Sequence, residues 1–171
     1  MAKIIAVTGR SGSGKTTLIS KLIPILKKRG IRTGSIKQTH HSVPLDTPGK
    51  DSDLHIQSGS EITAVMTPDK FGIFSERKNE SIEKFAKKYF HDIDLILLEG
   101  FKNENVYKME VFRAETGKKP LCSDKTFHIQ TVITDEEGKK YLKGIDSLNF
   151  LDIKNPERIA DSIENLLKKN V

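Results

Sequence analysis

The chain has 171 residues, of which 36% are hydrophobic and 30% are charged, a composition typical of one soluble, globular domain. Its 29 basic and 23 acidic residues give a net charge of +6, which suits an anionic ligand without identifying it. The lone cysteine, Cys122, excludes an internal disulfide and a cysteine zinc cluster. We therefore expect a single domain over residues 1–171.

Two further features concern location and partners. No segment approaches the roughly 20 apolar residues of a membrane span, and the N-terminal residues lack the apolar stretch of a signal peptide. We expect a cytoplasmic protein without a membrane partner. Basic residues are dispersed rather than interleaved with aromatic ones, so nucleic-acid binding is not expected.

The first third of the chain alternates between strand and helix patterns. A short apolar run predicts a buried strand at residues 4–8, and a stripe of leucine and isoleucine predicts a helix at residues 15–29. A second strand is expected at residues 31–37. Residues 38–53 form a polar loop with two prolines, and loops of this length are typically functional. A short helix is expected at residues 53–58.

The middle of the chain predicts a hairpin, a helix and a buried strand. Two short apolar runs at residues 62–66 and 71–75 flank a turn sequence that contains proline. Residues 81–89 carry a helical stripe, and residues 94–99 form the most apolar strand candidate.

The last third adds two strands, a mixed region and a terminal helix. Strands are expected at residues 108–113 and 130–134, and the mixed region from residue 136 to 155 includes a candidate edge strand at 148–153. Residues 156–169 predict the final helix. The alternation of strands and helices indicates an α/β fold whose sheet is mostly parallel with some antiparallel edge.

The strongest motif lies between the first strand and the first helix, where two glycines separated by four residues precede Lys-Thr. This is the P-loop pattern, and it predicts a P-loop NTPase-type three-layer sandwich. Glycines let the backbone N–H groups approach phosphate oxygens, while the lysine reaches the β- and γ-phosphates and the threonine hydroxyl binds Mg²⁺. The expected nucleotide contacts in this motif are Gly9, Arg10, Ser11, Gly12, Ser13, Gly14, Lys15, Thr16 and Thr17.

Acidic and basic residues near the ends of other strands complete the expected site. Glu99 ends an apolar strand, as in a Walker B element, whose carboxylate holds Mg²⁺ directly or through water. Lys37 follows the second strand and is expected to pair with phosphate, because ligands of open α/β sheets bind beyond the carboxyl ends of strands. Asp51 or Asp53 is expected to organise Mg²⁺ or water. The expected metal ligands are Thr16, Asp51 and Glu99, and the expected catalytic residues are Lys15, Asp51 and Glu99.

Three weaker signals remain open. Asp135 follows a strand, where a carboxylate can accept hydrogen bonds from a guanine edge, although the chain has no Asn-Lys-x-Asp motif. His40, His41 and His55 could bind a metal, but an ordinary polar loop is the favoured explanation of these residues. Cys122 has no neighbouring residues of the kind that activate a thiol.

Several segments, in order, resemble the molybdopterin-guanine dinucleotide biosynthesis protein B (MobB) family, and the resemblance covers most of residues 3–113. Gln38 stands where that family has histidine, and Ser58 and Ser60 stand where it has alanine. The segments that carry the resemblance lie at residues 9–17, 37–41, 48–55, 58–60, 98–102 and 108–113.

The resemblance implies a homodimeric GTP-binding protein with weak intrinsic hydrolysis. Such proteins assist the guanylyltransferase MobA, which attaches GMP to molybdopterin to form the guanine dinucleotide cofactor. Two alternatives remain. A small-molecule P-loop kinase fits the length of the chain, but the arginines are few and dispersed. A metal-delivery GTPase would use His40, His41 and His55, but the chain lacks a cysteine pair or histidine-rich tail.

Overall fold

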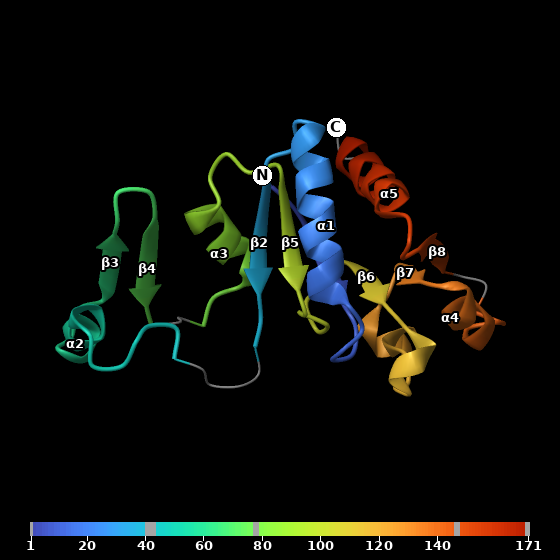
Figure 1. The fold of residues 1–171 in the computed structure, drawn as a ribbon, viewed down its shortest axis with the longest axis horizontal. Helices are drawn as coiled ribbons and strands as arrows, with labels where there is room; N and C mark the ends of the chain where they lie inside the picture. Colours follow the sequence, from blue (N-terminus) through green and yellow to red (C-terminus); the bar gives the residue numbers. More distant parts are fainter. Residues whose placement is uncertain (1, 40–43, 77–78, 146–147, 170–171) are drawn as a thin grey trace. The chain divides into compact units, whose positions relative to one another are not determined.

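The computed structural model describes residues 2–39, 44–76, 79–145 and 148–169. The chain divides into two compact units, one formed by Met1–Gln38 with Ile82–Val171 and the other by Thr39–Ser81. The first unit holds a six-stranded sheet and the second a two-stranded sheet (Figure 1). No helix within the described ranges is long and apolar enough to cross a membrane.

The large sheet of the first unit is built from parallel strand pairs. Its strand order is β2-β5-β1-β6-β7-β8, and each neighbouring pair runs in the same direction. The mostly parallel sheet expected from the sequence is therefore confirmed, and the carboxyl ends of its strands meet at one edge. The strands are β1 (Lys3–Thr8), β2 (Thr33–Lys37), β5 (Leu95–Glu99), β6 (Tyr107–Val111), β7 (Thr131–Thr134) and β8 (Asn149–Asp152).

Helices cover both faces of this sheet, as the three-layer prediction requires. Helices α1 (Lys15–Lys28) and α5 (Pro156–Lys168) lie side by side on one face (Figure 1). Helix α3 (Ile82–Tyr89) packs against the opposite face. Successive side chains of a strand point to opposite faces, so Val7 packs with α1 and α5 whereas Ala6 packs with α3.

Helix α1 continues through Pro24, although a proline inside a helix usually kinks or ends it. Each large side chain that the helix buries contributes roughly 1.5–3 kcal/mol, which offsets the backbone hydrogen bond that proline cannot make. The buried side chains of the helix are Leu18, Ile19, Leu22 and Leu26.

The second unit contains the predicted hairpin. Strands β3 (Ile62–Met66) and β4 (Phe71–Ser75) pair antiparallel, with Ile62 opposite Ser75 and Met66 opposite Phe71. Helix α2 (Asp51–Gln57) precedes them and contacts β3. The antiparallel strands form a sheet of their own rather than an edge of the large sheet.

Four short helical segments were not expected from the sequence. Each is only three to six residues long, too short for a helical period to be read from the sequence. They are η1 (Ala114–Thr116), η2 (Leu121–Ser123), η3 (Lys125–Phe127) and α4 (Glu136–Tyr141).

Candidate functional site

The predicted P-loop connects β1 to α1 and depends on glycine at its first position. Gly9 has φ +136°, and a Cβ atom there would collide with the carbonyl oxygen of Val111 and lie 2.9 Å from Oγ of Ser13. Gly12 and Gly14 also have positive φ, at +85° and +95°, where glycine carries no Cβ penalty. The fold therefore requires glycine at position 9 for space as well as for conformation.

Lys15 begins α1 and folds back over the loop. Its Nζ donates hydrogen bonds to the carbonyl oxygens of Gly9 at 3.0 Å and Arg10 at 2.9 Å. Burial lowers the pKa of Lys15; Glu99 acts in the opposite direction, while the positive charges of Lys37 and Lys118 lower the pKa further. An anionic ligand beside this ammonium would relieve that mutual repulsion.

Thr16, Glu99 and Lys37 meet at the carboxyl edge of the sheet. The Thr16 hydroxyl donates to Oε1 of Glu99 at 2.6 Å, and Nζ of Lys37 lies 3.3 Å from the same oxygen. Glu99 ends β5 between β1 and β2, in register with Val7 and with Lys37. Hydroxyl and carboxylate oxygens are the ligands that Mg²⁺ prefers, so this pair fits the expected metal.

The other hydroxyl residues of the predicted motif include Ser13 and Thr17. Within the described residues, neither forms a hydrogen bond with Glu99 like that of Thr16. The hydroxyl of Ser13 is buried, and no hydrogen-bond partner for it lies within the described residues. Thr17 is exposed on α1, and its carbonyl oxygen accepts a hydrogen bond from Ser20. Their expected contacts with a nucleotide stay predictions.

The segment after β6 also reaches the P-loop, which the sequence did not reveal. Nζ of Lys118 donates to the carbonyl oxygen of Ser11 at 3.0 Å, and Nε of Arg10 donates to the carbonyl oxygen of Lys119 at 3.1 Å. No motif marks Lys118 in the sequence, because its place depends on the packing of residues 113–128.

Glu110 of β6 anchors this segment. Its carboxylate is fully buried and accepts hydrogen bonds from the backbone N–H groups of Leu121 at 2.6 Å and Cys122 at 2.8 Å. Burial raises the pKa of Glu110, although these two hydrogen bonds and Arg10 act in the opposite direction. The same pocket raises the pKa of the Cys122 thiol to about 12, first through burial and then through Glu110.

Asp135 follows β7, as expected, and serves as the N-cap of α4. Its Oδ1 accepts a hydrogen bond from the backbone N–H of Gly138 at 2.9 Å. A cap of this kind is typical of aspartate and explains the residue without a ligand. Its expected contact with a guanine edge stays a prediction.

The remaining predicted residues belong to the second unit. Asp51 is exposed at the start of α2, and Asp53 accepts hydrogen bonds from Gly49 N and Gln57 Nε2, both at 2.7 Å. Their proposed roles toward Mg²⁺ or water stay predictions. His40 and His41 lie outside the described residues, within which no group of three or more His, Cys, Asp or Glu side chains could hold a metal ion.

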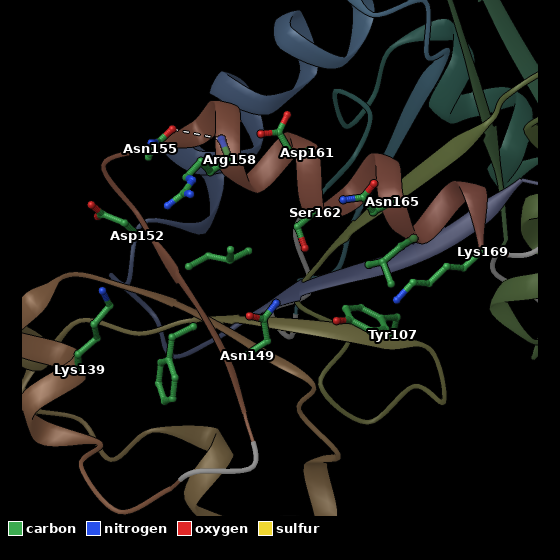
Figure 2. Close-up of a pocket in the computed structure, with 13 residues that line it drawn as sticks. Tyr107, Lys139, Asn149, Asp152, Asn155, Arg158, Asp161, Ser162, Asn165 and Lys169 are labelled. Carbon is green, nitrogen blue, oxygen red and sulfur yellow. Dashed lines mark hydrogen bonds between the residues drawn. The ribbon is translucent and has the colours of Figure 1, made fainter.

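A separate cavity of about 540 Å³ lies between β8 and α5 (Figure 2). Polar side chains such as Asn149, Arg158 and Asn165 line it, together with Tyr107 from β6. None of the predicted site residues is among the described residues around this cavity. The P-loop, rather than the cavity, therefore brings together four of the predicted residues, namely Lys15, Thr16, Lys37 and Glu99.

A glycine-rich loop between a parallel strand and a helix, facing a carboxylate on the adjacent strand, defines a P-loop NTPase fold. Residues 4–135 match the family model described as "Molybdopterin guanine dinucleotide synthesis protein B". This match covers more than half of the chain, so the chain belongs to the MobB family, as the sequence resemblance indicated.

Curated relatives and solved structures agree with this assignment. The chain is 36% identical to the "Molybdopterin-guanine dinucleotide biosynthesis adapter protein" of Escherichia coli, over 99% of the chain and 95% of the relative. It is 38% identical to the protein of the same name from Haemophilus influenzae, over 96% and 89%. A crystal structure of molybdopterin-guanine biosynthesis protein B superposes with a TM-score of 0.72 at 27% identity, over 95% of this chain and 99% of the other.

Proposed function

We propose that this protein binds GTP with Mg²⁺ at the P-loop and acts as an accessory protein in molybdenum cofactor biosynthesis. In this proposal it assists the attachment of GMP to molybdopterin, with a molybdopterin guanylyltransferase of the MobA type, molybdopterin, or both as partners. The observation that carries the proposal is the junction of the P-loop with the acidic end of β5, through the hydrogen bond between Thr16 and Glu99.

Each residue at this junction has a role toward a triphosphate. The loop backbone from Gly9 to Gly14 would cradle the phosphates, and the ammonium of Lys15 would neutralise the β- and γ-phosphates. Thr16 and Glu99 would hold Mg²⁺, which supplies charge neutralisation between phosphate oxygens when bound. Lys37 adds a positive charge at the same edge of the sheet, where its partner is Glu99.

The accessory role is supported by the relatives rather than by the geometry. Both of the relatives compared above carry the name adapter protein in molybdopterin-guanine dinucleotide biosynthesis, and this chain covers most of their length. We infer that the chain serves the same pathway. Its own GTP hydrolysis is expected to be weak, as the family resemblance implies.

The proposal includes a homodimer, and the second unit offers a surface for it. Residues directly opposite one another in an antiparallel pair share a face, and one face of the hairpin is almost wholly apolar and exposed. A two-stranded sheet is marginal in water by itself, so a second copy of the same face would stabilise it. This apolar face consists of Ile62, Ala64, Met66, Phe71 and Ile73.

A charged residue on the apolar face tests the dimer. We expect Phe71→Glu to shift the protein from dimer to monomer in light scattering at micromolar concentration. Lys70→Glu introduces the same side chain in the turn outside the strands, and this variant should remain dimeric. A dimeric Phe71→Glu protein, or a monomeric wild-type protein, would contradict this part of the proposal.

Calorimetric titration with GTP and with ATP, each in the presence of Mg²⁺, tests the nucleotide assignment. A clear preference for GTP is the expected result. A preference for ATP would overturn the assignment and favour the alternative of a small-molecule kinase, for which phosphate transfer to nucleosides or small alcohols would then be measured.

A further inference from the structure

Lys118 brings a positive charge to the P-loop from a distant part of the chain. Its Nζ donates to the carbonyl oxygen of Ser11 across a sequence separation of 107 residues, at 3.0 Å. Ser11 is the third residue of the loop that starts at Gly9, four residues before the start of α1. The Lys118 side chain is exposed, so its amino group can exchange this partner for a ligand oxygen.

The backbone beside Lys118 is held in place from two sides. Arg10 donates to the carbonyl oxygen of Lys119, which ties the segment to the P-loop. Two residues further on, Leu121 is buried and its N–H is fixed by the buried carboxylate of Glu110. Lys118 is therefore an exposed cation on a fixed backbone, an arrangement that reduces the entropy lost on binding a ligand.

The charges around Lys118 favour an anion. Lys118 lies close enough to Lys15 to lower the pKa of that residue, as does Lys37. Glu99 is the acidic partner of Lys37, whereas within the described part of the chain Lys118 has a carbonyl oxygen as its partner. Three lysines, Lys15, Lys37 and Lys118, therefore lie near one carboxylate, that of Glu99. Such an excess of positive charge indicates a site for a multiply charged anion.

We propose that Lys118 is a phosphate-binding residue that contacts the terminal phosphate of the bound triphosphate, as a cationic finger supplied by the same chain. The inference rests on the proposed nucleotide site and adds to it the residue that distinguishes a triphosphate from a diphosphate. Cations supplied in this way to a P-loop stabilise charge on the terminal phosphate. The amino group would leave the carbonyl oxygen of Ser11 for a phosphate oxygen, and the hydrogen bond so gained would be charge-assisted at both ends.

Equilibrium binding of GTP and GDP, each with Mg²⁺, to three variants tests this inference. We expect Lys118→Ala to weaken GTP binding about tenfold or more and GDP binding less than about threefold, because a charge-assisted hydrogen bond to the terminal phosphate is lost. Lys118→Arg should restore most of the GTP affinity. Lys119→Ala removes the same charge from the neighbouring exposed residue, whose contact with Arg10 uses only its backbone, and should bind both nucleotides like the wild type.

The outcomes separate this inference from the proposed function. If the wild-type protein binds GTP and Lys118→Ala binds it equally well, Lys118 is not a phosphate ligand. If Lys118→Ala weakens GTP and GDP by the same factor, Lys118 supports the loop instead, and the inference is also wrong. If the wild-type protein binds neither nucleotide, the proposed function fails and the inference fails with it. Thermal unfolding of each variant verifies that the fold is intact.

Discussion

Thr16 donates a hydrogen bond to Oε1 of Glu99 at 2.6 Å, although 83 residues separate the two in the sequence. The contact forms because β1 and β5 are adjacent and parallel, with Val7 in register with Glu99. The P-loop leaves the carboxyl end of β1, so the first turn of α1 lies beside the last residue of β5. This geometry turns two separate sequence motifs into one candidate Mg²⁺ site.

The hydroxyl of residue 16 should determine how much Mg²⁺ the protein needs. Thr16→Val keeps the size of the side chain but removes the donor to Glu99. We expect this variant to require about tenfold or more Mg²⁺ for half-maximal GTP binding. The reason is that it lacks the hydroxyl oxygen that would bind the metal. Thr16→Ser keeps the hydroxyl and should need Mg²⁺ at nearly the wild-type concentration. Equal Mg²⁺ requirements for the Val and Ser variants would refute the assignment.

The pKa of Lys15 should respond in opposite directions to two substitutions. Glu99 raises this pKa and Lys37 lowers it. Glu99→Gln removes a negative charge that favours the ammonium, so the Lys15 pKa should fall further. Lys37→Gln removes a positive charge that disfavours the ammonium, so the Lys15 pKa should rise. Titration of the Lys15 side chain by NMR measures both shifts, and two shifts of the same sign would contradict the charge arrangement.

Gly9 should tolerate a Cβ atom less well than Gly12. Both residues have positive φ, but only at Gly9 would a Cβ atom collide with a backbone carbonyl, whereas at Gly12 nothing lies within 4 Å. We expect Gly9→Ala to lower the free energy of unfolding by about 1–3 kcal/mol through backbone strain alone, and by more through the collision with Val111. Gly12→Ala experiences the strain without the collision and should lose less. Urea denaturation measures the difference in the free energy of unfolding between the two variants. Equal losses would show that the backbone around Gly9 shifts to relieve the collision with Val111 without lowering stability.

The thiol of Cys122 should be unreactive in the folded protein. Its pKa is raised to about 12 by burial and by Glu110, so the thiolate is scarce at pH 8. We expect iodoacetamide to label Cys122 at least about 100-fold more slowly in native protein than in urea, with mass spectrometry as the readout. Labelling at similar rates in the two states would show that the pocket around Glu110 opens readily.

The core of the site could be predicted because its parts are local in the sequence. The loop from Gly9 to Thr16 is a continuous motif, and Glu99 and Lys37 each end a strand that is recognisable from its own residues. A parallel sheet then brings these strand ends to one edge. The local sequence pattern, together with the rule that parallel strands end at one edge of the sheet, was sufficient to predict that these residues lie close together.

Lys118 and Glu110 could not be predicted in the same way. Lys118 lies in an irregular segment with three single-turn helices, whose course depends on the buried contacts of Leu121 and on two hydrogen bonds to Glu110. Glu110 itself stands inside a strand, where a fully buried carboxylate is an exception. Neither position has a periodic pattern, and only the folded chain relates them to the P-loop.

Equilibrium binding of GTP to the wild-type protein and to Lys15→Ala, with Mg²⁺ and with EDTA, tests the central claim most directly. Lys21→Ala, which removes an exposed lysine further along the same helix, is the control. The account predicts Mg²⁺-dependent binding in the wild type and in Lys21→Ala, and its loss in Lys15→Ala. Binding of the same affinity in Lys15→Ala, or binding unaffected by EDTA, would contradict a Mg²⁺–triphosphate site at this P-loop.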